Sequence, residues 1–154
     1  MFKLIGAILI LCASVCACYF YEKNEKHKIL ICEEYCELIK FIKSQIHYFS
    51  FPIDKILSSY KPHLKERNEI NEYRDLSKVK ENIAHSDKEE KALLEGFFSS
   101  LGKGLKAEEI ALCSYTASEL EKIVEKKKAN YPNNVKSFRA IVMFIGACAV
   151  ILLI

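Results

Sequence analysis

Seven cysteines and four histidines are the side chains in this 154-residue chain that are best suited to metal binding or catalysis. Cys32 and Cys36 lie four residues apart, on one face of a helix, and His27 is the nearest further candidate ligand. The C-x-x-C spacing typical of zinc sites is missing. We therefore interpret the two cysteines as packing residues on a helix seam, with a metal site as the alternative.

Patterns for catalysis or phosphate binding are weak. The histidines are scattered and pair with no obvious nucleophile. Gly102-Lys103-Gly104 lacks the G-x-x-x-x-G-K-[ST] spacing of a phosphate-binding loop, so we interpret it as a helix-breaking turn. Nucleic-acid binding is disfavoured, because residues 22–139 hold 22 basic and 20 acidic side chains. We predict no enzyme, no catalytic residue, no metal or other cofactor, and no small-molecule substrate.

Charged and uncharged side chains are segregated along the chain that carries these residues. Residues 4–21 and 140–154 contain no charged side chain, and Lys3 is the one charged residue outside 22–139. As helices the two apolar stretches would be ~27 Å and ~22 Å long, against a hydrocarbon layer of ~30 Å. The second stretch can be extended, because long basic side chains reach outward and let their neighbours enter the lipid.

We therefore predict a transmembrane helix at 1–21, a cytoplasmic helical domain at 22–134 and a second transmembrane helix at 135–154. For the second stretch a buried core helix is the alternative. For the first, the alternative is a signal peptide with a loose lipoprotein cleavage site, in which Cys18 would be lipidated. We favour a retained helix, because no linker of small residues follows it.

Basic residues crowd the domain side of both apolar stretches, which places the domain in the cytoplasm and both termini outside. The run of lysines at 126–128 also lies close enough to the membrane to meet anionic lipid. The residues that set this topology are Lys23, Lys26, Lys28, Lys126, Lys127, Lys128, Lys136 and Arg139.

Apolar residues in the domain recur at helical spacings of three and four. One helix should run from the first span to residue 50 and end at Phe51-Pro52, with a short helix at 53–60 after it. Residues 61–90 indicate one or two modest helices. The buried stripe of the first helix comprises Ile31, Tyr35, Leu38, Ile42, Ile46 and Phe49.

Two more helices are predicted on either side of the glycine turn, at 88–101 and 107–129. The second carries Ile110, Cys113, Ala117, Leu120 and Val124 on one face. Residues 131–134 should break it, so that Asn133 or Asn134 caps the second membrane helix. The predicted fold is all-α: an antiparallel bundle built on the first and last of these helices, flanked by the two transmembrane helices.

Several short segments, taken in order, resemble the stage III sporulation protein AB family. The opening Lys3-Leu4-Ile5-Gly6-Ala7-Ile8-Leu9-Ile10 does so, as does the ending from Phe138 through Gly146 to Ile154. Phe98-Ser99-Ser100-Leu101-Gly102 is similar to that family's F-x-x-L-G turn. The segments between the opening and this turn that also resemble the family are Leu38-Ile39, Gln45-Ile46-His47-Tyr48, Pro52-Ile53 and Ile56-Leu57.

The resemblance implies a protein of endospore-forming bacteria that acts in the channel complex between mother cell and forespore. The family's cytoplasmic domain looks like the platform subunit of type II secretion and type IV pilus machines. Such a platform would sit in the mother-cell membrane and couple a cytoplasmic assembly ATPase and other channel proteins to membrane components, without catalytic residues. A membrane-anchored sensor or regulator is the alternative function; it would need a ligand pocket or a signalling motif.

The glycine turn is the most plausible contact region of such a platform, because loops between rigid helices commonly carry contacts. Its candidate residues are Phe98, Leu101, Gly102, Lys103 and Lys106. Phe97 and Phe98 point about 100° apart on a helix, so one can fill the core while the other stays near the surface. The alternative is that both rings are core and the turn is merely a turn.

Topology gives the first testable prediction. Lys26 and Lys127, replaced singly by cysteine, should escape an impermeant thiol reagent in intact cells, since both should face the cytoplasm. The same sites should react once the cells are permeabilised. Labelling of either site in intact cells would overturn the assignment.

Overall fold

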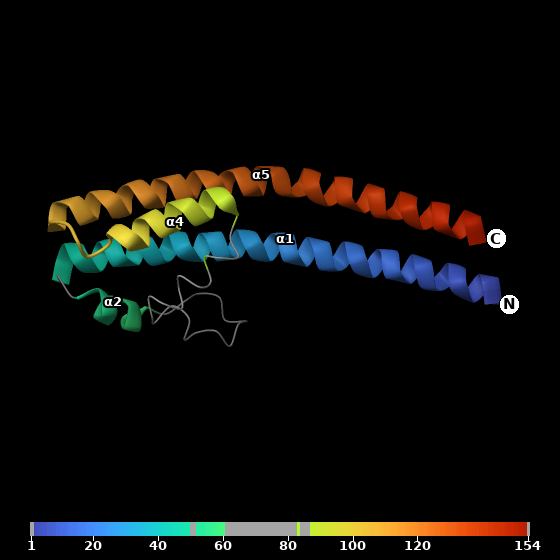
Figure 1. Ribbon diagram of the computed structural model, residues 1–154, viewed down its shortest axis with the longest axis horizontal. Coiled ribbons are helices and arrows are strands. Elements are labelled where there is room, and N and C mark those ends of the chain that lie inside the picture. The colour runs from blue at the N-terminus through green and yellow to red at the C-terminus, as the bar shows by residue number, and fades with distance from the viewer. Residues whose placement is uncertain (1, 50–51, 61–82, 84–86, 154) are drawn as a thin grey trace. The chain divides into compact units, whose positions relative to one another are not determined.

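The computed structural model describes residues 2–49, 52–60, 83 and 87–153. The helices in this part of the chain are α1 (Phe2–Phe49), α2 (Ile53–Ser59), α4 (Lys88–Ser100) and α5 (Lys106–Leu153) (Figure 1). The described residues contain no strand, which confirms the predicted all-α class. The helices predicted within 61–90 fall largely outside the described residues.

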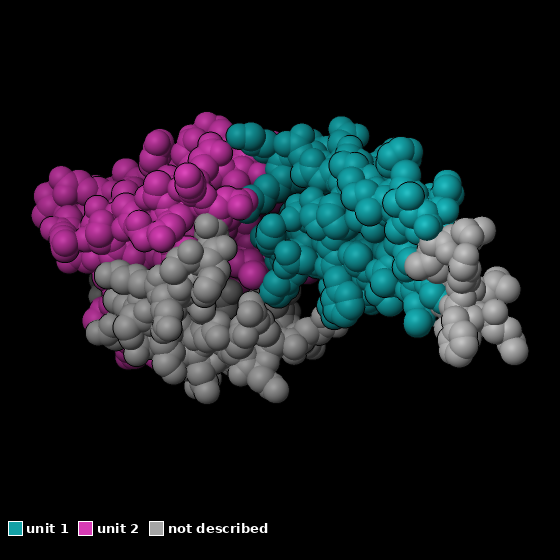
Figure 2. Space-filling model, turned by 45° about the vertical axis from the view of Figure 1, so that its right-hand side comes forward, with its two compact units in different colours: residues 1–29, 126–154 teal, residues 30–125 magenta. Residues whose placement is uncertain are grey.

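The chain divides into two compact units, coloured separately in Figure 2. Unit 1 comprises residues 1–29 and 126–154, and unit 2 comprises residues 30–125. Helices α1 and α5 contribute to both units. This division does not test where a membrane would begin, so the predicted boundaries at residues 21 and 134 stay predictions.

Unit 2 is built around one apolar core to which all four helices contribute. The Cys36 thiol lies against the backbone of Ala117, and the Lys43 ammonium is close enough to Cys113 to lower the pKa of its thiol. Higher residue numbers on α1 therefore face lower residue numbers on α5, so the two helices run antiparallel in this unit. The stripe predicted on α1 is buried from Tyr35 to Ile46. Phe49 was expected in that stripe but is 59% exposed, since α1 ends at this residue.

Local chemistry explains where the shorter helices begin. The Pro52 carbonyl accepts hydrogen bonds from the amides of Lys55 and Ile56, which starts α2 where the proline suggested. Asp87 precedes α4, and Glu89 and Glu90 lie in its first turn. The positive end of the helix dipole stabilises carboxylates at these positions. The predicted helices at 53–60 and 88–101 are thereby confirmed to within a residue.

The predicted break at residues 131–134 is wrong, because α5 continues through Pro132 to Leu153. A proline inside a helix costs about 3 kcal/mol, since it removes one backbone hydrogen bond and crowds the preceding turn. Contacts with α1 lie on both sides of it: the Tyr131 hydroxyl reaches Glu22 at 3.5 Å, and Phe138 stacks on Tyr21. These contacts explain how the local preference is overridden, and they leave Asn133 and Asn134 inside the helix.

Unit 1 pairs the two apolar segments directly. Gly146 lies so close to Ser14 that a Cβ atom on the glycine would sit 2.7 Å from the serine Oγ. The Ser14 hydroxyl donates to the Ile10 carbonyl of its own helix at 2.9 Å, so it needs no partner across the contact. Helix α5 contains a stretch long and apolar enough to cross a membrane, the one such helix found among the described residues, and 6% of that stretch is buried.

Truncating a side chain of the core should lower the stability of unit 2. In a fragment of residues 23–134, which includes all of unit 2 and should be strongly helical by circular dichroism, Leu120→Ala removes a fully buried side chain between α5 and its neighbours. We expect a loss of about 2–5 kcal/mol in the free energy of unfolding, measured in urea. Lys122→Ala on the exposed face is the control and should change it by less than about 0.5 kcal/mol. Equal effects would contradict the core assignment.

Candidate functional site

The turn predicted as a contact region joins α4 to α5. The Leu101 amide donates to the Phe97 carbonyl at 3.0 Å and the Lys103 amide to the Ser100 carbonyl at 3.3 Å, which closes α4. Gly102 follows in the left-handed region, at φ 84°. The Glu108 carboxylate then accepts the Leu105 amide at 3.0 Å and so caps α5.

The turn presents a narrower surface than the sequence suggested. Phe97 and Phe98 are 1% and 4% exposed, so the expectation that one ring stays near the surface is wrong. Their rings meet edge to face at 5.0 Å inside a core that wraps more than one side of α4. Leu101 is buried too, so the surface of the turn consists of Gly102, Lys103, Gly104, Leu105 and Lys106.

An open hollow of about 490 Å³ adjoins this surface. Ser99, Ser100 and Lys103 line one side of it, and Glu108, Glu109 and Leu112 of α5 line the other. Leu105 stands beside the hollow and is 73% exposed, unusually far for a leucine. Hydroxyl groups, charges of both signs and an exposed apolar side chain suit protein contact better than they suit chemistry on a bound substrate.

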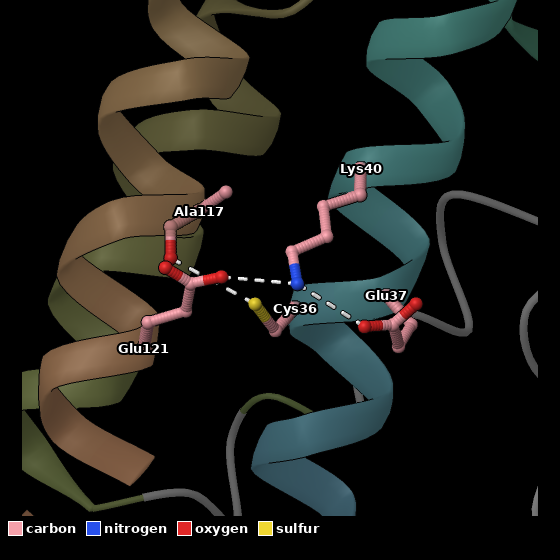
Figure 3. Close-up of polar contacts among 5 residues, drawn as sticks. All are labelled: Cys36, Glu37, Lys40, Ala117 and Glu121. Carbon is pink, nitrogen blue, oxygen red and sulfur yellow. Dashed lines mark hydrogen bonds and ion pairs between the residues drawn. The ribbon is translucent and has the colours of Figure 1, made fainter. Parts of the chain in front are cut away.

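A second polar cluster lies between α1 and α5 in unit 2 (Figure 3). The Lys40 ammonium bridges Glu121 at 3.0 Å and Glu37 at 3.2 Å. The hydrogen bond with Glu121 is the main reason that the pKa of Lys40 is raised above its usual range. About half of each side chain is exposed, so the pairs add little stability, and only the one with Glu121 joins the two helices.

One cysteine of the seam, Cys36, lies beside this cluster (Figure 3). The Cys36 thiol donates to the Ala117 carbonyl at 3.7 Å, and burial raises its pKa. Burial likewise raises the pKa of Cys113 to about 11, so both thiols stay protonated at neutral pH. Cys32 is buried as well, and no cluster of three histidine, cysteine or acidic side chains with a metal-binding arrangement occurs among the described residues.

All eight residues predicted to set the topology fall within unit 1. Seven of them are exposed, and Lys127 is half-buried. Two partners were not foreseen from the sequence: Arg139 pairs with Glu22 at 3.2 Å, and Lys28 pairs with Glu25 at 2.6 Å.

Sequence reasoning also missed a buried polar contact. The Tyr60 hydroxyl donates to the Glu34 carboxylate at 2.6 Å, and both side chains are buried. Glu34 lies beside the apolar stripe of α1, and this position was the only sign in the sequence that its carboxylate would be buried. Nothing in the spacing linked it to a tyrosine at the end of α2.

The sequence model of the stage III sporulation protein AB family matches residues 73–154, more than half of the chain. The chain belongs to the stage III sporulation protein AB family. No curated protein and no solved structure matches it. The matched region contains α4, the turn and α5, and so includes two of the segments on which the resemblance rested. Membership in the stage III sporulation protein AB family gives the chain a role in sporulation.

The two glycines of α4 and its turn should respond oppositely to the same change. Gly102→Ala puts a side chain at positive φ and 2.6 Å from the Ile53 Cδ1 atom, so we expect a loss of about 1–3 kcal/mol in unfolding free energy. Gly96→Ala meets nothing within 4 Å in the middle of α4, so we expect a gain of about 0.5–1 kcal/mol.

Urea unfolding of residues 23–134, followed by circular dichroism, measures both changes. A neutral Gly102→Ala would mean that the turn does not need the left-handed conformation. A destabilising Gly96→Ala would mean that α4 is crowded where the structure shows open space.

Proposed function

We propose that this chain is a non-enzymatic scaffold in the channel complex between mother cell and forespore. Residues 22–134 would form an antiparallel helical bundle in the mother-cell cytoplasm, with a transmembrane helix on either side. The observation that carries the proposal is the exposed apolar surface of unit 1, in a chain of a sporulation family. Its large side chains that are more than half exposed include Ile8, Leu9, Val15, Tyr19, Phe20, Ile141, Phe144, Ile145, Ile151 and Leu152.

Such a surface favours lipid over water. These side chains come from both helices of the pair, whose contact side is already occupied by Ser14 and Gly146. In water a continuous apolar surface of this kind would drive aggregation, whereas in a bilayer it costs nothing. Tyr19 and Phe20 lie at the polar end of the first segment, where aromatic rings favour the headgroup level.

Within the complex, the scaffold would couple a cytoplasmic assembly ATPase to membrane components through the surface of unit 2. The exposed residues of the turn, Lys103, Leu105 and Lys106, are the candidate contact. They stand at helix ends, in a turn that Gly102 permits through its positive φ and that the Glu108 cap holds. A fixed loop loses little entropy on binding, which favours contact with a partner.

Charge reversal at the turn tests this function. The double variant Lys103→Glu and Lys106→Glu alters exposed side chains, so the unfolding free energy should stay within about 0.5 kcal/mol of the original. The count of heat-resistant spores should fall clearly, because a partner that meets these lysines would now meet carboxylates.

The matched control is Lys88→Glu with Lys122→Glu, which makes the same charge change at exposed lysines on α4 and α5 away from the turn. It should sporulate normally. Normal sporulation of the turn variant, at wild-type protein levels, would remove the turn from the contact surface. A loss in both pairs alike would show that overall charge matters and not this turn.

A further inference from the structure

A layer of exposed basic side chains stands at the polar end of the two apolar segments of unit 1. The Tyr21 and Phe138 rings stack at 3.8 Å, and Glu22 pairs with Arg139, which sets residues 21–22 level with 138–139. Ser14 meets Gly146, so from this contact to the Tyr21–Phe138 stack the residue number increases on α1 and decreases on α5. The two segments therefore run antiparallel. At 1.5 Å per residue, the next basic residues, Lys23, Lys26 and Lys136, lie about 1.5 to 6 Å beyond that level.

The acidic side chains near this layer already form ion pairs with other basic residues. Unit 1 contains two of them, Glu22 and Glu25, which pair with Arg139 and Lys28. Unit 1 holds nine basic and two acidic side chains, a net charge of +7, whereas unit 2 holds 14 basic and 18 acidic ones, a net charge of −4. The excess positive charge is therefore local to unit 1.

We propose that Lys23, Lys26 and Lys136 bind the phosphate groups of anionic phospholipids. The inference rests on the membrane placement proposed above and adds a lipid class to it. All three side chains are exposed, and they occupy one layer about 4.5 Å thick, directly beyond the apolar surface that would contact acyl chains. A lipid offers both parts that this arrangement fits, an apolar chain and a negative headgroup at a fixed distance from it.

The lysine run at 126–128 serves as an internal comparison. It lies about 16 to 20 Å from the level of Arg139 along α5, roughly twice the screening length at physiological salt. Charges at that distance contribute little to headgroup binding, so the expectation that this lysine run meets anionic lipid does not hold for a continuous α5. The geometry thus separates two sets of three lysines in the same unit, one at the headgroup level and one beyond it.

The experiment uses the full chain reconstituted in phosphatidylcholine bilayers with a trace of spin-labelled phosphatidylglycerol or spin-labelled phosphatidylcholine. Electron paramagnetic resonance resolves the lipid immobilised at the protein and gives a relative association constant for each label. We expect phosphatidylglycerol to be preferred by roughly two- to fivefold. The preference should vanish in Lys23→Gln/Lys26→Gln/Lys136→Gln and persist in Lys126→Gln/Lys127→Gln/Lys128→Gln.

The alternative outcomes separate this inference from the function on which it rests. No immobilised lipid of either kind would overturn both the membrane placement and the inference. Immobilised lipid without a preference would overturn the inference and leave the membrane placement standing. An equal loss of preference in the two triple variants would show attraction by total charge and would overturn the assignment to the layer.

Discussion

The packing of α1 against α5 is the contact on which the rest of this structure depends. In unit 2 the two helices bury an apolar seam from Tyr35 to Ile46 on one side and from Cys113 to Val124 on the other. Helices α2 and α4 complete that core. In unit 1 the same two helices meet through a glycine and a serine. The side chains at the contact between α1 and α5 thus differ between the two units.

The two units arrange polarity in opposite ways. Unit 2 buries leucine, isoleucine and phenylalanine and places its ion pairs, such as Lys40 with Glu121, on the outside. Unit 1 exposes many of its large apolar side chains, and its two helices meet both at the small residues Ser14 and Gly146 and at the stacked rings of Tyr21 and Phe138. Among helices that lie in lipid, close approach through small residues takes the place of the hydrophobic effect, because acyl chains solvate leucine as well as a protein core does. The Ser14–Gly146 contact would serve this purpose in the membrane placement proposed for unit 1.

Local periodicity predicted the helices and most of their buried positions correctly, since burial on one face follows directly from a 3.6-residue repeat. It failed where contacts distant in sequence decide the outcome. Pro132 is a helix breaker by any local rule, yet contacts from Glu22 and Tyr21 flank it. One of Phe97 and Phe98 was expected near the surface, but both are buried, because periodicity along α4 does not show how far the core wraps around it. Likewise, no spacing links Glu22 to Arg139, although the charge asymmetry drew attention to Arg139 as a residue that would set the topology.

The three buried thiols of unit 2 make its opening directly observable. Cys32 and Cys36 belong to α1 and Cys113 to α5, and all three are buried. Alkylation requires a thiolate that the reagent can reach, so each cysteine reacts only during excursions that expose it. If part of the core opens on its own, the cysteines that this local opening exposes will be modified faster than the others. Equal rates would mean that both helices separate in one cooperative event, so the kinetics of modification report the order in which the domain comes apart.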